Sequence, residues 1–372
     1  MNLSVGIVGL PNVGKSTLFN ALLKKQQALA ANYPFATIEP NIGIVPVPDS
    51  RLAVLADIIA KELSPSTSLG ISRPPIVSAV VQFVDIAGLV KGASEGAGLG
   101  NKFLSHIREV KIIAHVVRAF EDGNVIKEGS VDPKSDYETI RMELILADLQ
   151  TIENSKLKSK NSKLQLKTQI LEKIEEALNR GISVREISLS DEEKEATADL
   201  GLLSAKPEII VLNVAERDYT KEKIEELVYQ YTSILVNSKK SVVVICAKIE
   251  SELSELSDQE QKEYLKDLGI EESGLERLIQ KAYQELGLIS FLTAGEKEVR
   301  AWTIRLGYTS LLASGEIHTD FMKKFIKAEV VSYEDYVVNN GLKGAREKGK
   351  ARLEGRDYIM KDGDVVEFRI GS

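Results

Sequence analysis

The chain has 372 residues, of which 43% are hydrophobic and 28% charged, and its net charge is −7. This length predicts two or three domains, and the acidic balance argues against global attraction to nucleic acid. The single cysteine, Cys246, excludes an intrachain disulfide. No run approaches the about 18 apolar residues of a membrane span, and no charged leader precedes an apolar core. We therefore expect a cytoplasmic protein that makes no membrane contact.

A phosphate-binding loop follows the first predicted strand. The apolar stretch 3–8 precedes Gly9-Leu-Pro-Asn-Val-Gly-Lys-Ser16, which fits the pattern G-x-x-x-x-G-K-[ST], and a helical stretch follows from Thr17. Glycines let backbone N–H groups curl around a polyphosphate, and the positive end of the helix dipole points at the same place. Lys15 is expected to reach the β- and γ-phosphates as the catalytic cation. The Ser16 hydroxyl is expected to bind the Mg²⁺ that bridges them.

Two further segments fit the switch regions of such a protein. The connection 30–41 has two prolines and little periodicity. Within it, Thr37 is the candidate that closes on the magnesium and is released after hydrolysis. An apolar strand at 80–84 ends in Asp85-Ile-Ala-Gly88. Here Asp85 is expected to hold Mg²⁺ through water, and the Gly88 N–H is expected to approach the γ-phosphate.

The next residue is Leu89, which cannot form the hydrogen bond that a glutamine uses to orient the attacking water. We therefore predict slow hydrolysis unless a backbone group, a monovalent cation or a partner positions the water. The glycine-rich run 90–104 is interpreted as the second switch, leading into a helix near 102–110. A strand at 112–117 contains His115, which is a candidate catalytic acid or base, although a lone histidine in a strand is more often structural.

A helical segment interrupts the α/β pattern between about 123 and 206. Its apolar residues recur at 3-4-3 spacing in two rows, which predicts two antiparallel helices packed as a coiled-coil hairpin. The rows are Met142, Ile145, Leu149 and Ile152, and then Leu164, Leu171, Ile174 and Leu178. Between them lie Lys156, Lys158, Lys160, Lys163 and Lys167. This basic turn is either a solvated tip or a contact to RNA phosphates.

The α/β pattern resumes with strands at 208–212 and 241–245, which end in Asn213-Val-Ala-Glu216 and Cys246-Ala-Lys248. In Ras-type GTPases, the corresponding loops read the base with Asn-Lys-x-Asp and Ser-Ala-Lys. Here Val214 stands at the lysine position and Glu216 at the aspartate position. A longer carboxylate would be displaced into guanine, and adenine has no matching pair of donors. The change predicts loss of guanine selectivity and a preference for ATP.

The stretch 287–372 is predicted to form a separate domain. Residues 298–304 alternate as a strand, 319–327 suits a helix, and 362–370 reads as a turn followed by a terminal strand. No nucleophile or metal cluster indicates a second active site. A basic run comprises Lys343, Arg346, Lys348, Lys350 and Arg352. It is either a partner-binding surface or a solvated loop.

Together, these motifs resemble the YchF, or Obg-like ATPase, family, over essentially the whole chain. The resemblance is carried by Asn12, 34–41, 85–92, 98–103 and 213–216. It implies a translation-factor-related ATPase that prefers ATP to GTP, associates with ribosomes, and ends in a β-grasp module called TGS, which binds RNA or a partner. It also implies the following site residues: Asn12, Val13, Gly14, Lys15, Ser16 and Thr17 around the phosphates, Ser16 and Thr37 on Mg²⁺, Asn12 on K⁺, and the backbone of Val214 on adenine.

We therefore expect an α/β protein of three parts. A phosphate-loop NTPase domain of the Ras-like kind, with a mostly parallel sheet, spans 1–122 and 207–286; the helical hairpin spans 123–206, and the TGS-like domain spans 287–372. Phosphate-site residues, Gly88 and the base-loop residues Asn213, Val214 and Glu216 would bind the nucleotide. Expected partners are ATP, Mg²⁺ and the ribosome, both as large subunit and as 70S-type particle, with nucleotide-driven switching in translation or stress regulation. The alternatives are a ribosome-binding GTPase and an adaptor whose nucleotide is structural.

Overall fold

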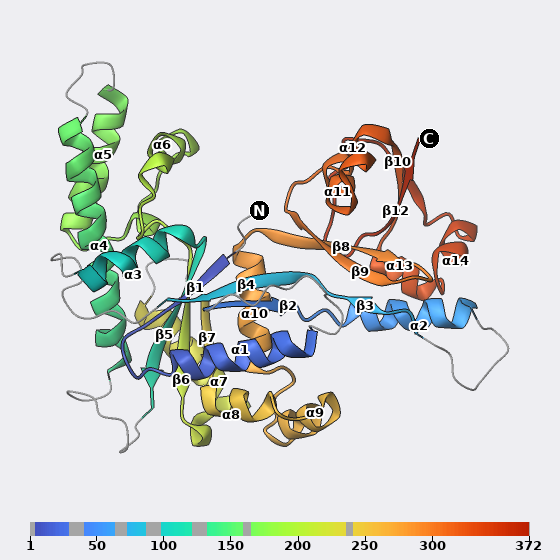
Figure 1. Cartoon of the computed structure of the whole chain (residues 1–372), viewed down its shortest axis with the longest axis horizontal. Coiled ribbons are helices and arrows are strands. Elements are labelled where there is room, and N and C mark those ends of the chain that lie inside the picture. Colours follow the sequence, from blue (N-terminus) through green and yellow to red (C-terminus); the bar gives the residue numbers. More distant parts are fainter. Residues whose placement is uncertain are drawn as a thin grey trace. The chain divides into compact units, whose positions relative to one another are not determined.

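The chain forms two compact units in a computed structural model that describes residues 4–29, 41–63, 73–86, 98–120, 132–158, 165–235 and 241–371. Unit 1 comprises Met1–Ala31, Phe35–Val45 and Gln82–Ala282, and unit 2 comprises Asn32–Pro34, Pro46–Val81 and Tyr283–Ser372. Each unit is built on its own sheet, and Figure 1 labels most of the strands and helices of both.

The sheet of unit 1 has the strand order β2-β4-β1-β5-β6-β7. Its strands are β1 (Ser4–Val8), β2 (Ile42–Pro46), β4 (Val80–Asp85), β5 (Ile112–Ala119), β6 (Glu208–Val214) and β7 (Ser241–Ile245). All the pairings among β4, β1, β5, β6 and β7 are parallel, which confirms the mostly parallel sheet. Strands β1 and β6 are buried at every residue, as continuous apolar strands are when helices cover both faces. The loops at the carboxyl ends of these strands therefore meet at one edge.

Nine α-helices lie in the described part of unit 1 or run out of it. They are α1 (Lys15–Leu29), α3 (Gly98–Glu109), α4 (Pro133–Lys158), α5 (Gln165–Asn179), α6 (Asp191–Thr197), α7 (Lys221–Leu235), α8 (Ala247–Leu253), α9 (Asp258–Asp267) and α10 (Gly274–Glu285). Within these ranges and those of unit 2, no helix is both long enough and apolar enough to span a membrane.

The predicted hairpin corresponds to α4 and α5, which lie side by side (Figure 1). Ile145, Ile152, Ile174 and Leu178 are buried in one shared core, as the 3-4-3 rows predict. Met142 departs from the pattern and is 43% exposed, because α4 at this height packs Ile140 and Leu144 toward the sheet instead. The segment 183–202 adds Val184 and Leu202 to the same core, so the insertion is more than a two-helix hairpin.

Unit 2 contains a sheet with the order β11-β10-β12-β8-β9-β3. Its elements are α2 (Arg51–Leu63), β3 (Ile76–Val77), β8 (Leu288–Ala294), β9 (Val299–Arg305), α11 (Ser310–Ile317), α12 (Thr319–Lys324), β10 (Phe325–Val331), α13 (Tyr333–Val338), α14 (Leu342–Glu347), β11 (Arg352–Glu354) and β12 (Val365–Ile370). The central pair, β8 and β12, is parallel, and the outer pairings of β8 with β9 and of β12 with β10 are antiparallel. This is the β-grasp arrangement expected for the C-terminal domain.

Two expectations for unit 2 need correction. The helix expected over 319–327 ends at Lys324, and Phe325 begins strand β10, because Phe325 and Ala328 bury their side chains in the sheet core. The stretch 46–81 lies within the range expected for the nucleotide-binding domain, but it belongs to unit 2. Its helix α2 buries Leu52, Leu55 and Ile59 and contacts β8 and β9, while β3 pairs with β9. The limits of the inserted region, 123–206, remain a prediction.

Candidate nucleotide-binding site

A cavity of about 660 Å³ opens at the carboxyl edge of the parallel sheet in unit 1. It is lined by Asn12, Gly14, Lys15, Ser16, Thr17, Phe120, Asn213, Val214, Ala215, Glu216, Cys246, Ala247 and Lys248. Three loops that are far apart in the sequence therefore meet here: the one before α1, the one after β6 and the one before α8. This convergence is the one that the phosphate and base motifs predict.

The loop before α1 curls because two of its residues adopt left-handed backbone conformations. Asn12 has a φ of 62° and Gly14 a φ of 96°, a region that asparagine tolerates and glycine prefers. A Cβ atom on Gly14 would lie 2.2 Å from Nδ2 of Asn213. Only glycine fits at this position, and helix α1 then begins at Lys15 with its positive end at the cavity.

Lys15 supplies the main positive charge of the cavity. Its ammonium donates to the carbonyl oxygens of Gly9 at 2.9 Å and Leu10 at 2.7 Å, and the residue is 8% exposed. Burial lowers the pKa of Lys15, and the nearby Asp85 partly opposes the shift. Burial raises the pKa of Asp85, and Lys15 opposes that shift in turn. The two side chains are thus electrostatic neighbours beside the phosphate loop, with Asp85 at the end of β4.

Oxygen ligands for Mg²⁺ are available in this arrangement. The Ser16 hydroxyl belongs to a residue that lines the cavity, and Asp85 lies close enough to Lys15 to shift its pKa. Hydroxyl, carboxylate and phosphate oxygens with water are the ligands that magnesium prefers. Among the described residues, this cavity included, no three histidine, cysteine, aspartate or glutamate residues form a group that could hold a metal by themselves. The donor set therefore fits a magnesium ion that is bound together with a polyphosphate. The other predicted phosphate-site and metal residues, Gly88 and Thr37, lie outside the described residues, as does Leu89.

Asn213 joins two of the loops. Its Nδ2 donates to the carbonyl oxygen of Val13 at 2.9 Å, and its Oδ1 accepts from the backbone N–H of Ala247 at 2.9 Å. The residue is 5% exposed, so both hydrogen bonds are shielded from water. Asn213, at the end of β6, therefore joins the phosphate loop to the start of α8, in addition to lining the cavity.

The carboxylate of Glu216 is already engaged. Its Oε1 lies 2.8 Å from the ammonium of Lys248, across the two base loops. Both side chains are exposed, and the hydrogen bond to Glu216 raises the pKa of Lys248. Val214, at the position of the usual lysine, is 3% exposed and packs in the apolar core of the unit. The base end of the cavity therefore offers an apolar wall and a paired carboxylate.

Phe120 is a cavity residue that the sequence analysis missed. It follows β5 directly and lines the cavity together with the base loops. The guanidinium of Arg118 lies over its ring at 4.6 Å from the centroid, and Arg118 Nε donates to the Phe120 carbonyl oxygen at 2.9 Å. The sequence does place this aromatic residue just after a core strand, and that strand neighbours the strand before the phosphate loop. This position is the signal that could have indicated a cavity residue.

His115, the candidate acid or base, does not reach the cavity. It is 1% exposed, and its Nδ1 lies 3.0 Å from Oε1 of Glu208. The other oxygen of Glu208 accepts from the Tyr137 hydroxyl at 3.1 Å and forms an ion pair with Arg185 at 2.8 Å. Burial and the negative charge of Glu208 raise the pKa of Tyr137. This closed cluster joins β5 and β6 to α4 and to the inserted region, so the geometry favours a structural role for His115.

Several cations of each basic run form ion pairs within their own unit. Near the α4–α5 turn, Lys156 pairs with Glu175, and Lys167 pairs with Asp199 at 2.8 Å. The side chains of Lys158, Lys160 and Lys163 lie outside the described part of the chain. In unit 2, the pairs are Arg346 with Glu329 at 2.6 Å, Lys350 with Asp335 at 3.2 Å and Arg352 with Glu354 at 3.1 Å. The linear clustering of lysine and arginine therefore overstates the charge that is available to a partner.

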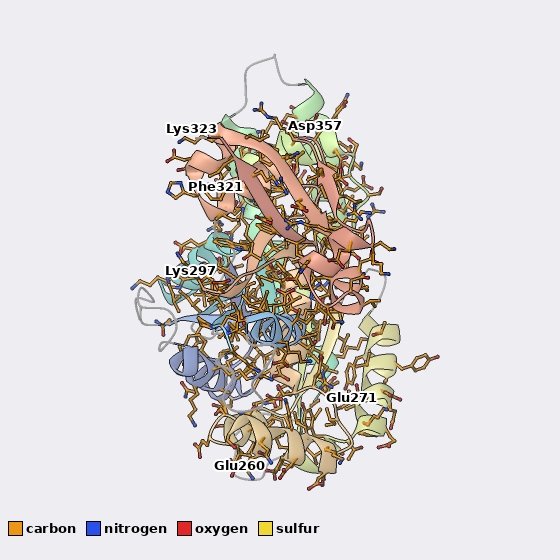
Figure 2. All side chains as sticks on the ribbon, turned by 90° about the vertical axis from the view of Figure 1, so that its right-hand side faces the viewer. Glu260, Glu271, Lys297, Phe321, Lys323 and Asp357 are labelled. Atoms are coloured by element: carbon orange, nitrogen blue, oxygen red, sulfur yellow. The ribbon has the colours of Figure 1, made fainter. Side chains whose placement is uncertain are left out.

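A cavity of about 500 Å³ in unit 2 has a different character. Its lining includes Ile317, Phe321, Val365 and Phe368, with Lys297 at the turn between β8 and β9. Lys297 and Phe321 are labelled in Figure 2. Apolar side chains dominate, and among these residues there is neither a phosphate loop nor the amino end of a long helix.

The parallel sheet, the curled loop before α1 and the cavity at the carboxyl edge define a phosphate-loop nucleoside triphosphatase. Comparison with known proteins agrees. A family model described as "50S ribosome-binding GTPase" matches residues 4–162, and one described as "YchF-GTPase_C: Protein of unknown function" matches residues 288–371. The chain belongs to the YchF family, because it is 47% identical over 376 residues to the ribosome-binding ATPase YchF of Bacillus subtilis, covering 99% of both chains.

Further relatives extend this comparison. The ribosome-binding ATPase YchF of Escherichia coli O157:H7 is 46% identical, again with 99% of each chain covered. The solved structure of the Schizosaccharomyces pombe YchF GTPase has a TM-score of 0.83 and 37% identity, and it covers 99% of this chain and 98% of that one. The bacterial names specify an ATPase and the yeast name a GTPase, so the choice of base has to be argued from the cavity.

Proposed function

We propose that this protein hydrolyses ATP to ADP and phosphate in preference to GTP and acts as a nucleotide-dependent switch on the ribosome in the cytoplasm. The observation that carries the choice of ATP is the Glu216–Lys248 pair at 2.8 Å, with Val214 at the lysine position of the base loop. A guanine reader needs a free carboxylate to accept from two donors on the base edge. Adenine has no such donors, and a mismatch of this kind costs a factor of about 10⁴.

Different residues of the cavity would bind the phosphates and the base. Lys15 would leave the carbonyl oxygens that it now contacts and bind the β- and γ-phosphates, while the curled loop of Asn12 to Thr17 donates its N–H groups. Ser16 and Thr37 would hold Mg²⁺ directly and Asp85 through water, and the ion would neutralise charge on the transferred phosphate. Asn12 is the proposed contact for a K⁺ ion. Phe120 and Val214 would enclose the adenine ring.

Unaided hydrolysis is expected to be slow, because Leu89 offers no group to orient water. A ribosomal component would then supply what is missing, with the large subunit and the 70S-type particle as proposed partners. The lysine-rich hairpin tip and unit 2 remain predicted contact regions for ribosomal RNA, although the ion pairs described above leave fewer free charges there. The names of the bacterial relatives, each a ribosome-binding ATPase, support this assignment.

The proposal is tested by measuring phosphate release from ATP and from GTP, with and without purified ribosomes, in magnesium and potassium buffer. We expect ATP to be hydrolysed faster than GTP, and we expect ribosomes to accelerate the hydrolysis of ATP. Faster hydrolysis of GTP would support the GTPase alternative. A Lys15→Ala protein that complements a deletion strain fully would instead indicate an adaptor with a structural nucleotide.

A further inference from the structure

Three cations lie together at the amino-terminal edge of the sheet in unit 1. Arg108 is in the last turn of α3, and Lys111 directly precedes β5, where its backbone N–H donates to the Ser4 carbonyl oxygen at 2.9 Å. Lys206 comes just before Pro207, whose carbonyl oxygen accepts from Ile113 at 3.0 Å. Because β1, β5 and β6 are parallel, this edge is the one opposite the nucleotide cavity.

Lys206 binds the backbone at the end of α3, next to the other two cations. Its ammonium donates to the carbonyl oxygens of Arg108 at 3.1 Å and Val110 at 2.5 Å, and it thereby caps the carboxyl end of α3. Burial lowers the pKa of Lys206, and the positive charges of Lys111 and Arg108 lower it further. Lys111 and Arg108 therefore both lie close enough to Lys206 to act on its charge.

No described carboxylate forms an ion pair with the side chain of Arg108 or Lys111, and both residues are exposed. Asp148 is the carboxylate that acts on Lys206, but it is 1% exposed. It accepts from the backbone N–H groups of Leu203 and Ser204 and from the Ser204 hydroxyl, so it cannot turn toward the surface cations.

The exposed positive charge of Arg108 and Lys111 contrasts with the chain as a whole, whose net charge is −7. Five cations of the two basic runs form ion pairs: Lys156, Lys167, Arg346, Lys350 and Arg352. Exposed carboxylates cover other surfaces, such as Glu260 on α9 and Glu271 before α10 (Figure 2). Exposed like charges repel one another, and a ligand of opposite charge relieves that repulsion. The three cations are not among the lining residues of the cavities described above, so they suit an extended polyanion better than an enclosed small anion.

We propose that Arg108 and Lys111, positioned by Lys206, form a contact surface for the phosphate backbone of ribosomal RNA. The proposal rests on the ribosome binding proposed above and names the surface that would carry it. Point charges on flexible side chains bind phosphates without reading sequence, and each neutralised phosphate adds salt dependence. Because α3 follows the predicted second switch, this surface would also lie on the element that senses the nucleotide.

The test compares an Arg108→Ala, Lys111→Ala double variant with a Lys262→Ala, Lys266→Ala double variant of α9. Both remove two exposed cations, so their net charges are identical. Equilibrium co-sedimentation with purified ribosomes is measured at 50 and 200 mM potassium salt. Thermal unfolding and ribosome-free ATP hydrolysis serve as checks of folding, and both should match the wild-type protein.

We expect the Arg108, Lys111 variant to bind more weakly at low salt and to lose less affinity as salt rises. Its slope in log K against log salt should be shallower by about 1 per removed cation, so its deficit relative to wild type should shrink by about tenfold over this fourfold salt range. Wild-type binding with the wild-type slope in this variant would overturn the proposal, and a deficit with an unchanged slope would indicate a protein contact instead. If the wild-type protein itself fails to sediment, the proposed ribosome binding fails as well.

Discussion

Polar side chains at the carboxyl edge of the unit 1 sheet line a cavity, where a ligand can reach them. Those between β5, β6 and α4 are buried and bond to one another instead. Lys15, Ser16 and Thr17 line a cavity and find few partners in the protein beyond loop carbonyls. Glu208, at the amino end of β6 in the same sheet, is saturated by His115, Tyr137 and Arg185. Both regions contain titratable residues on parallel strands or directly after them.

The difference teaches that residue type alone does not mark a functional group in this protein. A buried charge that already has its partners stabilises the fold, and an uncompensated one is available to a ligand. The same distinction separates the paired arginines of unit 2 from Arg108 and Lys111 in unit 1. Each of the following experiments tests whether open and closed groups behave as differently as this comparison predicts.

Replacing Glu208 with alanine should produce the largest effect. It leaves the buried guanidinium of Arg185 without its carboxylate, which costs about 3–5 kcal/mol of unfolding free energy. Urea denaturation measures this loss, and the rate of ATP hydrolysis per folded molecule should not change. Glu216→Ala, at an exposed ion pair, is the control and should cost less than about 1 kcal/mol. A normal stability with a hundredfold slower hydrolysis would place the cluster in catalysis.

Lys15→Ala should reduce the single-turnover rate of ATP hydrolysis by about 10²–10³-fold, because it removes the charge that faces the developing phosphate negative charge. The stability of the protein should change little, since the cost of burying the Lys15 charge offsets what its contacts with the loop carbonyls and its attraction to Asp85 contribute. Lys24→Ala is the matched control, as Lys24 lies on the same helix but pairs with Glu255 on the surface. Equal rates in the two variants would contradict the assignment of the cavity.

Glu329→Gln should destabilise unit 2 in a manner that depends on pH. Hydrogen bonds from Arg346 and Arg369 lower the pKa of Glu329 to about 2, from an ordinary value of 4.5. Because the folded-state pKa is depressed, the stabilisation is fully present above about pH 5 and is lost as pH falls toward 2. Because both arginines are partly exposed to solvent, the full shift is reduced, and the lost stabilisation should be about 1–2 kcal/mol at pH 7 and less than half of that near pH 3.

Denaturant titrations of the wild-type and Glu329→Gln proteins at pH 7 and pH 3 measure this change. Glu367→Gln is the comparison variant, because Glu367 also contacts Arg346 but is 56% exposed. A destabilisation that is equal at both pH values would mean that the carboxylate charge of Glu329 is not what holds the two arginines.

Phe120→Ala should have the smallest effect, confined to the base. Loss of stacking against adenine is expected to weaken ATP binding by about 1–3 kcal/mol, which isothermal calorimetry detects. Binding of inorganic tripolyphosphate, which has no base, serves as the internal control and should be unchanged. If both ligands weaken together, Phe120 supports the loop structure rather than the base.

Local motifs made much of the cavity predictable. The phosphate loop works through backbone geometry that a short pattern encodes, and Gly14 is required there because of its positive φ and because a Cβ atom would collide with Asn213. Asp85 and the base loops were predictable because they end apolar strands, and parallel strands bring their carboxyl ends to one edge.

Other features depend on contacts between distant parts of the chain. Helix α2 is amphipathic, but nothing local in its sequence says that its apolar face packs against β8 and β9 more than 200 residues later. Glu208 lies 93 residues after His115, and the carboxylates that pair with Arg346 come from the neighbouring strands β10 and β12, so no local pattern predicts either set of contacts. Phe120 was missed because one aromatic residue after a strand has no spacing pattern.

Calorimetric titration of nucleotide-free protein with non-hydrolysable ATP and GTP analogues, in magnesium and potassium buffer, tests the assignment of the base most directly. We predict that the ATP analogue binds at least about tenfold more tightly, a difference of about 1.4 kcal/mol. Equal or tighter binding of the GTP analogue would mean that Glu216 still reads guanine despite its pairing with Lys248, and that the protein is a GTPase.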